Sequence, residues 1–179
     1  MIRRVGLSLN FALVLGATVL RAQGVEFSVG AGPGIPLGSF DDAVKIGWQG
    51  IGGVSFQPRT LPVGLQVDVS FSRFSDQTFD RQSQIIYGTA DATYHFHTAE
   101  ATSMRPYLIG GLGIYNSKET GSDALNGSTT KLGLNAGAGL DFKAGSVGLF
   151  VEGRFHNVFV NGPNIEFFPI NLGVRFGGG

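Results

Sequence analysis

The sequence contains no cysteine and few charged residues. Of its 179 residues none is Cys, only one is Trp, and charged residues make up 15%. The absence of Cys excludes a disulfide scaffold, a Cys-ligated zinc or iron-sulfur site, a thiol nucleophile and a lipidated N-terminal Cys. Thirteen basic and thirteen acidic residues balance to a formal net charge of zero. We therefore expect no nucleic acid as a partner, because no excess of positive charge is present to attract it.

Glycine and apolar residues are abundant instead. The chain has 29 Gly and 15 Phe, and 42% of its residues are hydrophobic. A disordered chain needs low hydrophobicity and high net charge, so this composition excludes disorder as the general state. The glycines follow no three-residue period, which excludes collagen. The length is typical of one folded domain.

Residues 1–23 have the pattern of a cleavable secretory signal peptide. Arg3 and Arg4 precede an apolar stretch centred on residues 11–20, and small and polar residues follow it. The stretch is shorter than the roughly 20 residues that a transmembrane helix needs. We expect cleavage after Ala22, which removes three arginines, leaves the exported chain mildly acidic and leaves residues 24–179 as the domain. An uncleaved N-terminal anchor is the alternative.

Beyond residue 23, apolar residues alternate with small or polar ones. The clearest example is residues 63–71, where every second residue from Val63 to Phe71 is apolar. Strict alternation predicts β-strands with one apolar face. The other segments with this alternation are 25–31, 86–96, 132–142, 147–155 and 168–176, and it is weaker in 47–57 and 105–116. The sequence thus predicts an all-β domain of eight strands.

The predicted connections fall into two classes that alternate along the chain. Longer polar connections are expected at residues 34–46, 73–82, 117–130 and 157–163, and shorter ones at 58–62, 98–103 and 144–146. Long loops at one rim and short turns at the other are typical of outer-membrane barrels. We therefore predict an eight-stranded antiparallel up-and-down transmembrane β-barrel, located in the cell outer membrane with both termini in the periplasm.

Aromatic residues recur at intervals of eight along single strand faces, as in Trp48 and Phe56. Eight residues of tilted strand rise roughly 21 Å, close to the ~25 Å apolar band of these barrels. This spacing predicts two aromatic girdles at the membrane interfaces. The predicted girdle residues are Trp48, Phe56, Phe71, Tyr107, Tyr115, Phe142, Phe155, Phe168 and Phe176. Which face of 47–57 and of 105–116 is inside stays open, because a shift of one residue exchanges the faces.

The opposite strand faces carry charged residues that we expect inside the barrel. An eight-stranded barrel is just wide enough to be filled by its own side chains, and buried charges must pair. A packed polar lumen is therefore predicted, not an open pore. The predicted lumen network consists of Glu26, Asp68, Asp91, Asp141, Lys143, Glu152, Arg154 and Arg175. Glu152 and Arg154 are two residues apart, so each is expected to bond to neighbouring strands and not to the other.

The segments 105–116, 148–157 and 169–176 resemble the bacterial outer-membrane β-barrel domain family of small OmpA/OmpX-like proteins. Asn171, Gly173 and Phe176 match the family's C-terminal assembly signal, but Gly178 stands where a second aromatic residue is common. The resemblance implies outer-membrane lipids and lipopolysaccharide as surroundings. It also implies the barrel-assembly machinery and periplasmic chaperones as partners during biogenesis, and a monomeric state.

Few residues suggest chemistry. Asp91, His95 and His97 share one predicted inward face and His156 lies on another strand, and these residue types suit a metal site or an acid-base pair. The favoured interpretation is that they are polar residues of the rim and lumen. The glycines at 30–34 and 137–139 superficially suggest a nucleotide-binding loop, but no predicted helix follows to hold a phosphate. We therefore predict no catalytic, cofactor or metal site.

The expected function is a non-enzymatic one, with a structural or surface-interaction role carried by the longer loops, particularly 34–46 and 117–130. Three alternatives stay open. The first is a small passive channel for small or hydrophobic solutes, similar to OmpW-like barrels. The second is a membrane enzyme that modifies lipid A. The third is a soluble lipocalin-like barrel with its apolar face inside.

Overall fold

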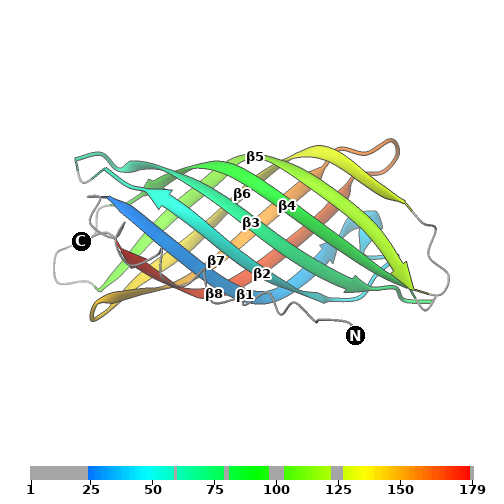
Figure 1. Ribbon diagram of the computed structural model, residues 1–179, viewed down its shortest axis with the longest axis horizontal. Coiled ribbons are helices and arrows are strands. Elements are labelled where there is room, and N and C mark those ends of the chain that lie inside the picture. The colour runs from blue at the N-terminus through cyan, green and yellow to red at the C-terminus, as the bar shows by residue number, and fades with distance from the viewer. Residues whose placement is uncertain (1–23, 59, 79–80, 97–102, 122–126, 178–179) are drawn as a thin grey trace, which may run out of the picture.

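The structure is a closed barrel of eight antiparallel strands. It is a computed structural model that describes residues 24–58, 60–78, 81–96, 103–121 and 127–177; the predicted signal peptide and His97 lie outside these ranges. Each strand pairs with its neighbours in chain order, and β8 closes the barrel on β1 (Figure 1). The strands are β1 Val25–Leu37, β2 Gly47–Phe56, β3 Val63–Ser75, β4 Arg81–His95, β5 Met104–Gly121, β6 Ser128–Ala144, β7 Val147–Val158 and β8 Ile165–Gly177. The predicted all-β, up-and-down architecture is confirmed.

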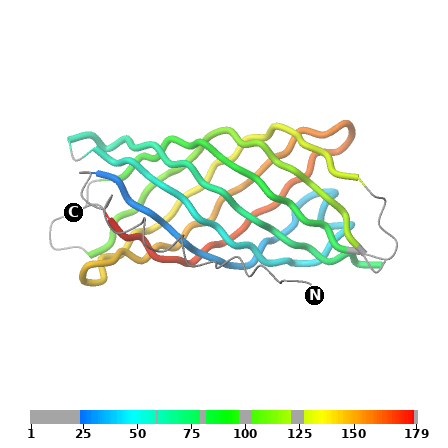
Figure 2. The backbone as a smooth tube through the Cα atoms, in the orientation of Figure 1, coloured from blue at the N-terminus to red at the C-terminus, as the bar shows by residue number. Residues whose placement is uncertain are grey.

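The two ends of the barrel differ in which connections they hold. β1 begins and β8 ends at the end where β2 turns into β3, β4 into β5 and β6 into β7; we call this the termini end (left in Figures 1 and 2). The opposite end, the loop end, holds the other four connections, including the short 3-10 helix η1, Gly38–Phe40. Over the described residues no helix is long and apolar enough to cross a membrane.

The strands at the loop end are longer than the sequence predicts. β3 continues to Ser75 and β4 starts at Arg81, while β5 reaches Gly121 and β6 starts at Ser128. Much of the predicted loops 73–82 and 117–130 is therefore strand, and the predicted difference in loop length between the two ends is much reduced. Backbone pairing does not need apolar side chains, so the ladder runs on into polar residues where apolar alternation stops. The periplasmic placement of the termini stays a prediction.

The outside of the barrel is apolar and the inside is mostly polar. On β3, Val63, Leu65, Val67 and Val69 are 48–63% exposed, whereas the residues between them are buried. The same alternation places exposed Leu, Ile and Val residues on the outward faces of the other strands. We call these outward residues the apolar belt. This is the reverse of a soluble lipocalin-like barrel, and it is what a lipid surrounding requires.

Tyr107 and Tyr115 lie inside the barrel, so their prediction as girdle residues is wrong. Their exposed fractions are 1% and 0%, while Leu108 and Leu112 on the other face of β5 are 50% and 65% exposed. Both faces of this strand carry apolar residues, so alternation could not tell them apart. The facing is set by pairing with β4, where Tyr115 lies opposite the inward Tyr87. The other predicted girdle residues lie on outward faces: Trp48, Phe56, Phe71, Phe142, Phe155, Phe168 and Phe176.

Inward glycines make room for the large interior side chains. An added methyl group at Gly139 would overlap the ring of Tyr107, and one at Gly137 would meet the backbone and side chain of Arg154. Gly139 and Gly137 are the register partners of Tyr107 and Arg154 on the adjacent strand β6, so the large side chains lie over bare backbone of their neighbour. This accounts for part of the glycine excess.

Candidate functional site: the closed interior of the barrel

The barrel interior consists of a polar cluster and an apolar plug stacked along the axis. The order of inward residues along each strand dictates this arrangement. On β3 the inward residues run from Gln66 and Asp68 through Ser70 and Ser72 to Phe74 at the loop end. On β4, Ile85 and Tyr87 lie near the loop end, and Thr89, Asp91 and Thr93 follow. Polar residues therefore fill the middle of the barrel and apolar ones close the loop end.

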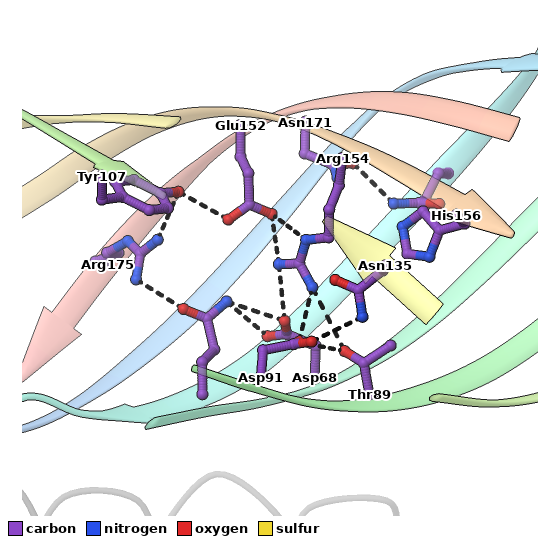
Figure 3. Close-up of polar contacts among 12 residues, drawn as sticks. Asp68, Thr89, Asp91, Tyr107, Asn135, Glu152, Arg154, His156, Asn171 and Arg175 are labelled. Atoms are coloured by element: carbon purple, nitrogen blue, oxygen red, sulfur yellow. Dashed lines mark hydrogen bonds and ion pairs between the residues drawn. The ribbon is translucent and has the colours of Figure 1, made fainter. Parts of the chain in front are cut away.

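Arg154 is the centre of the polar cluster. Its Nη2 atom lies 2.9 Å from Oδ2 of Asp68, and its Nη1 atom lies 3.0 Å from Oδ2 of Asp91 (Figure 3). Its Nε donates to Oε1 of Glu152 at 3.0 Å. One guanidinium from β7 thus binds carboxylates from β3, β4 and β7. The expectation that Glu152 and Arg154 do not pair with each other is wrong, because the Arg side chain folds back along its strand while its Nη atoms reach across the lumen.

Neutral side chains complete the coordination of Asp68 and Asp91. Gln66 Nε2 donates to both oxygens of Asp68, at 3.1 and 2.9 Å. Asn135 Nδ2 and Thr89 Oγ1 each donate to Asp91 at 2.7 Å. Buried charges are tolerated when they are both paired and hydrogen-bonded, and this cluster meets both conditions. The sequence reasoning did not single out these neutral partners, although their inward positions on alternating strands would have identified them.

A second polar group adjoins the first on the side of the termini end. Tyr107 joins the two, because its hydroxyl donates to Glu152 Oε2 at 2.8 Å and accepts from Arg175 Nη2 at 2.9 Å. The Arg175 guanidinium also lies over the rings of Tyr107 and Phe150, at 5.2 and 4.9 Å from the ring centroids. Its Nε is 3.0 Å from Oδ1 of Asp141. Polar contacts therefore continue from the middle of the barrel toward its rim.

Two predicted network residues lie apart from these groups. Lys143 is exposed, and its prediction as a lumen residue is wrong: β6 ends one residue later, so its inward position opens to the rim and not to the interior. Glu26 near the start of β1 is only partly buried, and its charge acts on Arg175 without a direct contact to the Arg154 cluster. Of the eight predicted residues, Asp68, Asp91, Asp141, Glu152, Arg154 and Arg175 lie in the two connected groups.

The loop end of the interior is closed by an aromatic and aliphatic cluster, which we call the loop-end plug. Its buried members are Val44, Phe74, Ile85, Tyr87, Tyr115, Val158 and Phe167, and His156 packs among them. The His156 ring stacks on Phe167 with a centroid distance of 4.7 Å, and Tyr87 stacks on Tyr115 at 4.9 Å. Phe74 packs edge-on against Phe167 at 5.9 Å. These side chains come from five strands and fill the cross-section.

The chain between β1 and β2 covers the plug. Phe40 packs edge-on against Phe74 at 5.1 Å, and Val44 is 5% exposed. Backbone hydrogen bonds fasten this segment to the end of β3, with Lys45 N donating to Ser75 O at 2.8 Å and Gln77 N donating to Ala43 O at 3.1 Å. The loop end is thus sealed by a bonded segment above an apolar layer.

The described histidines are interior residues in different surroundings. His156 Nδ1 lies 2.8 Å from the hydroxyl of Tyr115, within the plug. His95 Nε2 lies 3.2 Å from Asp141 Oδ2, near the termini end. Over the described part of the chain no three His, Asp or Glu side chains are arranged to hold a metal ion. Of the suggested group of Asp91, His95, His97 and His156, the structure places Asp91 on Arg154, His95 beside Asp141 and His156 in the plug, so these three are not brought together; His97 lies outside the described ranges.

Several known structures share this fold. Neisserial surface protein A is 18% identical, with a TM-score of 0.69 over 87% of this chain and 97% of that chain. The N-terminal barrel domain of Pseudomonas aeruginosa OprF is 18% identical, with a TM-score of 0.53 over 86% and 98%. The outer-membrane enzyme PagL is 19% identical, with a TM-score of 0.55 over 84% and 99%. At these identities the likeness concerns the fold alone.

The sequence itself identifies the family. Comparison with curated proteins gives no match. The model of the outer membrane protein β-barrel domain matches residues 9–176, which is nearly the whole chain. Together with the closed barrel and its apolar belt, this match shows that the chain belongs to the outer-membrane protein β-barrel domain family.

Proposed function

We propose that this protein is a non-enzymatic outer-membrane barrel with a closed interior, whose role is structural or interactive and is carried by its loop end. The observation that carries the proposal is the filled lumen. A passive channel needs a continuous water-filled path, but Arg154, Glu152 and Asp68 are each 1% exposed and the loop-end plug lies above them. A path for solutes would have to disrupt both layers. The small-channel alternative is therefore the weaker one.

The extent of the strands supports placing the loop end at the cell surface. At the termini end the apolar belt reaches the last strand residues, such as Val63, Val147 and Phe176. At the loop end β4 and β5 extend past the belt with polar outward residues such as Gln82, Gln84 and Lys118. Outer-membrane barrels extend furthest on the extracellular side. The fold neighbour described as a Neisserial surface protein has a name consistent with such a role.

A lipid-modifying enzyme is the alternative that the likeness to PagL raises, since that protein is an enzyme with the same fold. An enzyme that acts on membrane lipid needs its reacting groups on the outer wall or at a rim that lipid can reach. His156 is 2% exposed inside the plug, and His95 is 7% exposed beside Asp141. These positions favour structural roles for both rings and support a non-enzymatic function.

Exposure of the loop end at the cell surface can be tested by cysteine labelling. The chain has no native cysteine, so only an introduced thiol will react. Asp42→Cys places a thiol at an exposed position of the loop end, and Ser146→Cys places one at an exposed position of the termini end. A maleimide that cannot cross the outer membrane should label the first variant on intact cells, and the second only after the membrane is permeabilised. The reverse pattern would contradict the proposed orientation and with it the proposed role of the loop end.

A further inference from the structure

The outward face of the wall carries two basic residues just beyond the apolar belt at the loop end. Arg73 lies on β3 and Lys118 lies on β5, and both pair with Gln84 of β4, which lies between them. They therefore lie in one row across three strands, roughly 10 Å apart given the spacing of paired strands. The flanking inward residues Ser72 and Phe74 are fully buried, so Arg73 projects outward. We call Arg73 and Lys118 the basic row.

The basic row lies at the depth of lipid head groups. Trp48 is the register partner of Arg73, and its ring contacts that of Phe71 at a centroid distance of 5.3 Å. Trp and other aromatic residues mark the boundary between hydrocarbon and head groups. Below Lys118 the outward face of β5 continues to Ile114, which is 58% exposed. A basic side chain directly beyond such a boundary extends its charge into the head-group layer.

No ion pair found between described residues neutralises the charges of the basic row. Arg73 Nε donates to Oε1 of Gln82 at 2.7 Å, which is a neutral partner. None of the ion pairs between described residues involves Arg73 or Lys118. The outward face of β8 carries an acid, Glu166, at the loop end. Among the described outward strand positions at the loop end, the basic residues are Arg73 on β3 and Lys118 on β5.

The outward strand face described at the termini end carries no comparable pair of basic residues. Its outward face ends in paired aromatic residues, with Phe27 stacked on Phe176 at a centroid distance of 5.9 Å and Tyr94 edge-on against Phe96 at 5.2 Å. The outward strand positions described there are apolar. The two leaflets would therefore meet chemically different surfaces.

We propose that the basic row binds the phosphate groups of a lipid in the leaflet that surrounds the loop end. A guanidinium binds phosphate through paired hydrogen bonds, and an ammonium binds it as a point charge. The acyl chains of the same lipid would lie against the apolar belt below. That this leaflet is the outer one rests on the orientation proposed above, but binding itself does not depend on it.

Trp48 provides the means to test this, because it is the only Trp in the chain and faces the same lipid as Arg73. The barrel is placed in phosphatidylcholine nanodiscs that contain dansyl-labelled bisphosphoryl lipid A or its dephosphorylated form. Energy transfer from Trp48 to dansyl reports how strongly each lipid gathers at this site. Charge near a membrane surface contributes about fivefold in affinity for each basic residue. We expect the phosphorylated lipid to be preferred at least tenfold.

The double variant Arg73→Gln with Lys118→Gln should lose this preference, and 1 M salt should weaken it in the wild type. The matched control is Arg105→Gln with Lys143→Gln, which removes two exposed positive charges at the termini end and should retain the preference. No preference in the wild type, or a preference that survives the first double variant or 1 M salt, would overturn the proposal. The energy-transfer measurement tests lipid binding alone, and cell-surface labelling tests the orientation alone. A failure of one proposal can therefore be told from a failure of the other.

Discussion

Arg154 and Asp68 form an ion pair that crosses the lumen, with Nη2 and Oδ2 2.9 Å apart and both side chains 1% exposed. They lie on β7 and β3, which are not neighbours in the sheet. The pair therefore connects opposite sides of the barrel, in addition to the backbone ladder that connects adjacent strands. Asp91 and Glu152 bind the same guanidinium, so one side chain holds three parts of the wall together.

Loss of the Arg154 charge should destabilise the barrel strongly. In Arg154→Met three buried carboxylates lose the guanidinium with which each forms an ion pair, and breaking a buried ion pair in this way costs about 3–5 kcal/mol. The free energy of unfolding in detergent or lipid, measured by denaturant titration of the heat-modifiable gel shift, should fall by this amount.

Two further variants separate the charge effect from other causes. Arg105→Met removes a half-exposed Arg at the rim and should change the unfolding free energy by less than about 1 kcal/mol. Adding Asp68→Asn, Asp91→Asn and Glu152→Gln to Arg154→Met should recover part of the loss. A fall of less than 1 kcal/mol in Arg154→Met alone would show that the cluster does not stabilise the fold.

Tyr107→Phe tests the inward facing of β5. The hydroxyl connects Glu152 to Arg175, and leaving buried polar groups without a partner costs about 1–3 kcal/mol. Tyr94→Phe is the matched control, since Tyr94 is 43% exposed on the outer face of β4. Denaturant titration should show a loss for Tyr107→Phe alone. Equal effects of the two substitutions would mean that Tyr107 faces lipid, as the aromatic spacing first suggested.

Gly139→Ala tests whether the interior is packed without spare room. The added methyl group meets the Tyr107 ring, and overpacking of this kind costs about 1–3 kcal/mol. Gly50→Ala on β2 is the control, because an added methyl group there meets nothing within 4 Å. The stability of Gly139→Ala should fall and that of Gly50→Ala should not. A neutral Gly139→Ala would indicate a roomier lumen than the structure has.

The alternation along β3 shows how much of this structure is readable from sequence. From Val63 to Phe71 the alternating apolar residues are outward and Asp68 is inward, so this stretch predicts both the belt and the lumen. On β5 the same reasoning fails, because Ile109 and Tyr115 face inward while Leu108 and Ile114 face outward. When both faces of a strand are apolar, the sequence of that strand does not show which face is inside. For β5 the inward face is decided by its pairing with β4.

Most of the charged interior residues were predictable from the sequence, but the contacts between them were not. Which acids meet Arg154 depends on the stagger of strands around the closed barrel, and a single strand's pattern does not contain that stagger. The sequence does not predict the loop-end plug, because the aromatic spacing places Tyr115 in a girdle, while Phe74 lies in the predicted loop 73–82 and Phe167 directly before the predicted strand 168–176. An aromatic residue of a plug can be told from one of a girdle only when it is known which side chains of that strand point into the barrel and which point toward lipid.

The central claim is that the interior is closed, and single-channel recording in planar bilayers tests it most directly. The wild-type protein, with insertion verified by the heat-modifiable gel shift of protein recovered from the bilayer lipids, should give no stepwise conductance. Under the same conditions Phe74→Ala with Phe167→Ala removes two rings of the loop-end plug and leaves the Arg154 cluster, so it should stay closed as well. Reproducible conductance steps in the wild type would contradict the closed lumen and favour a passive channel.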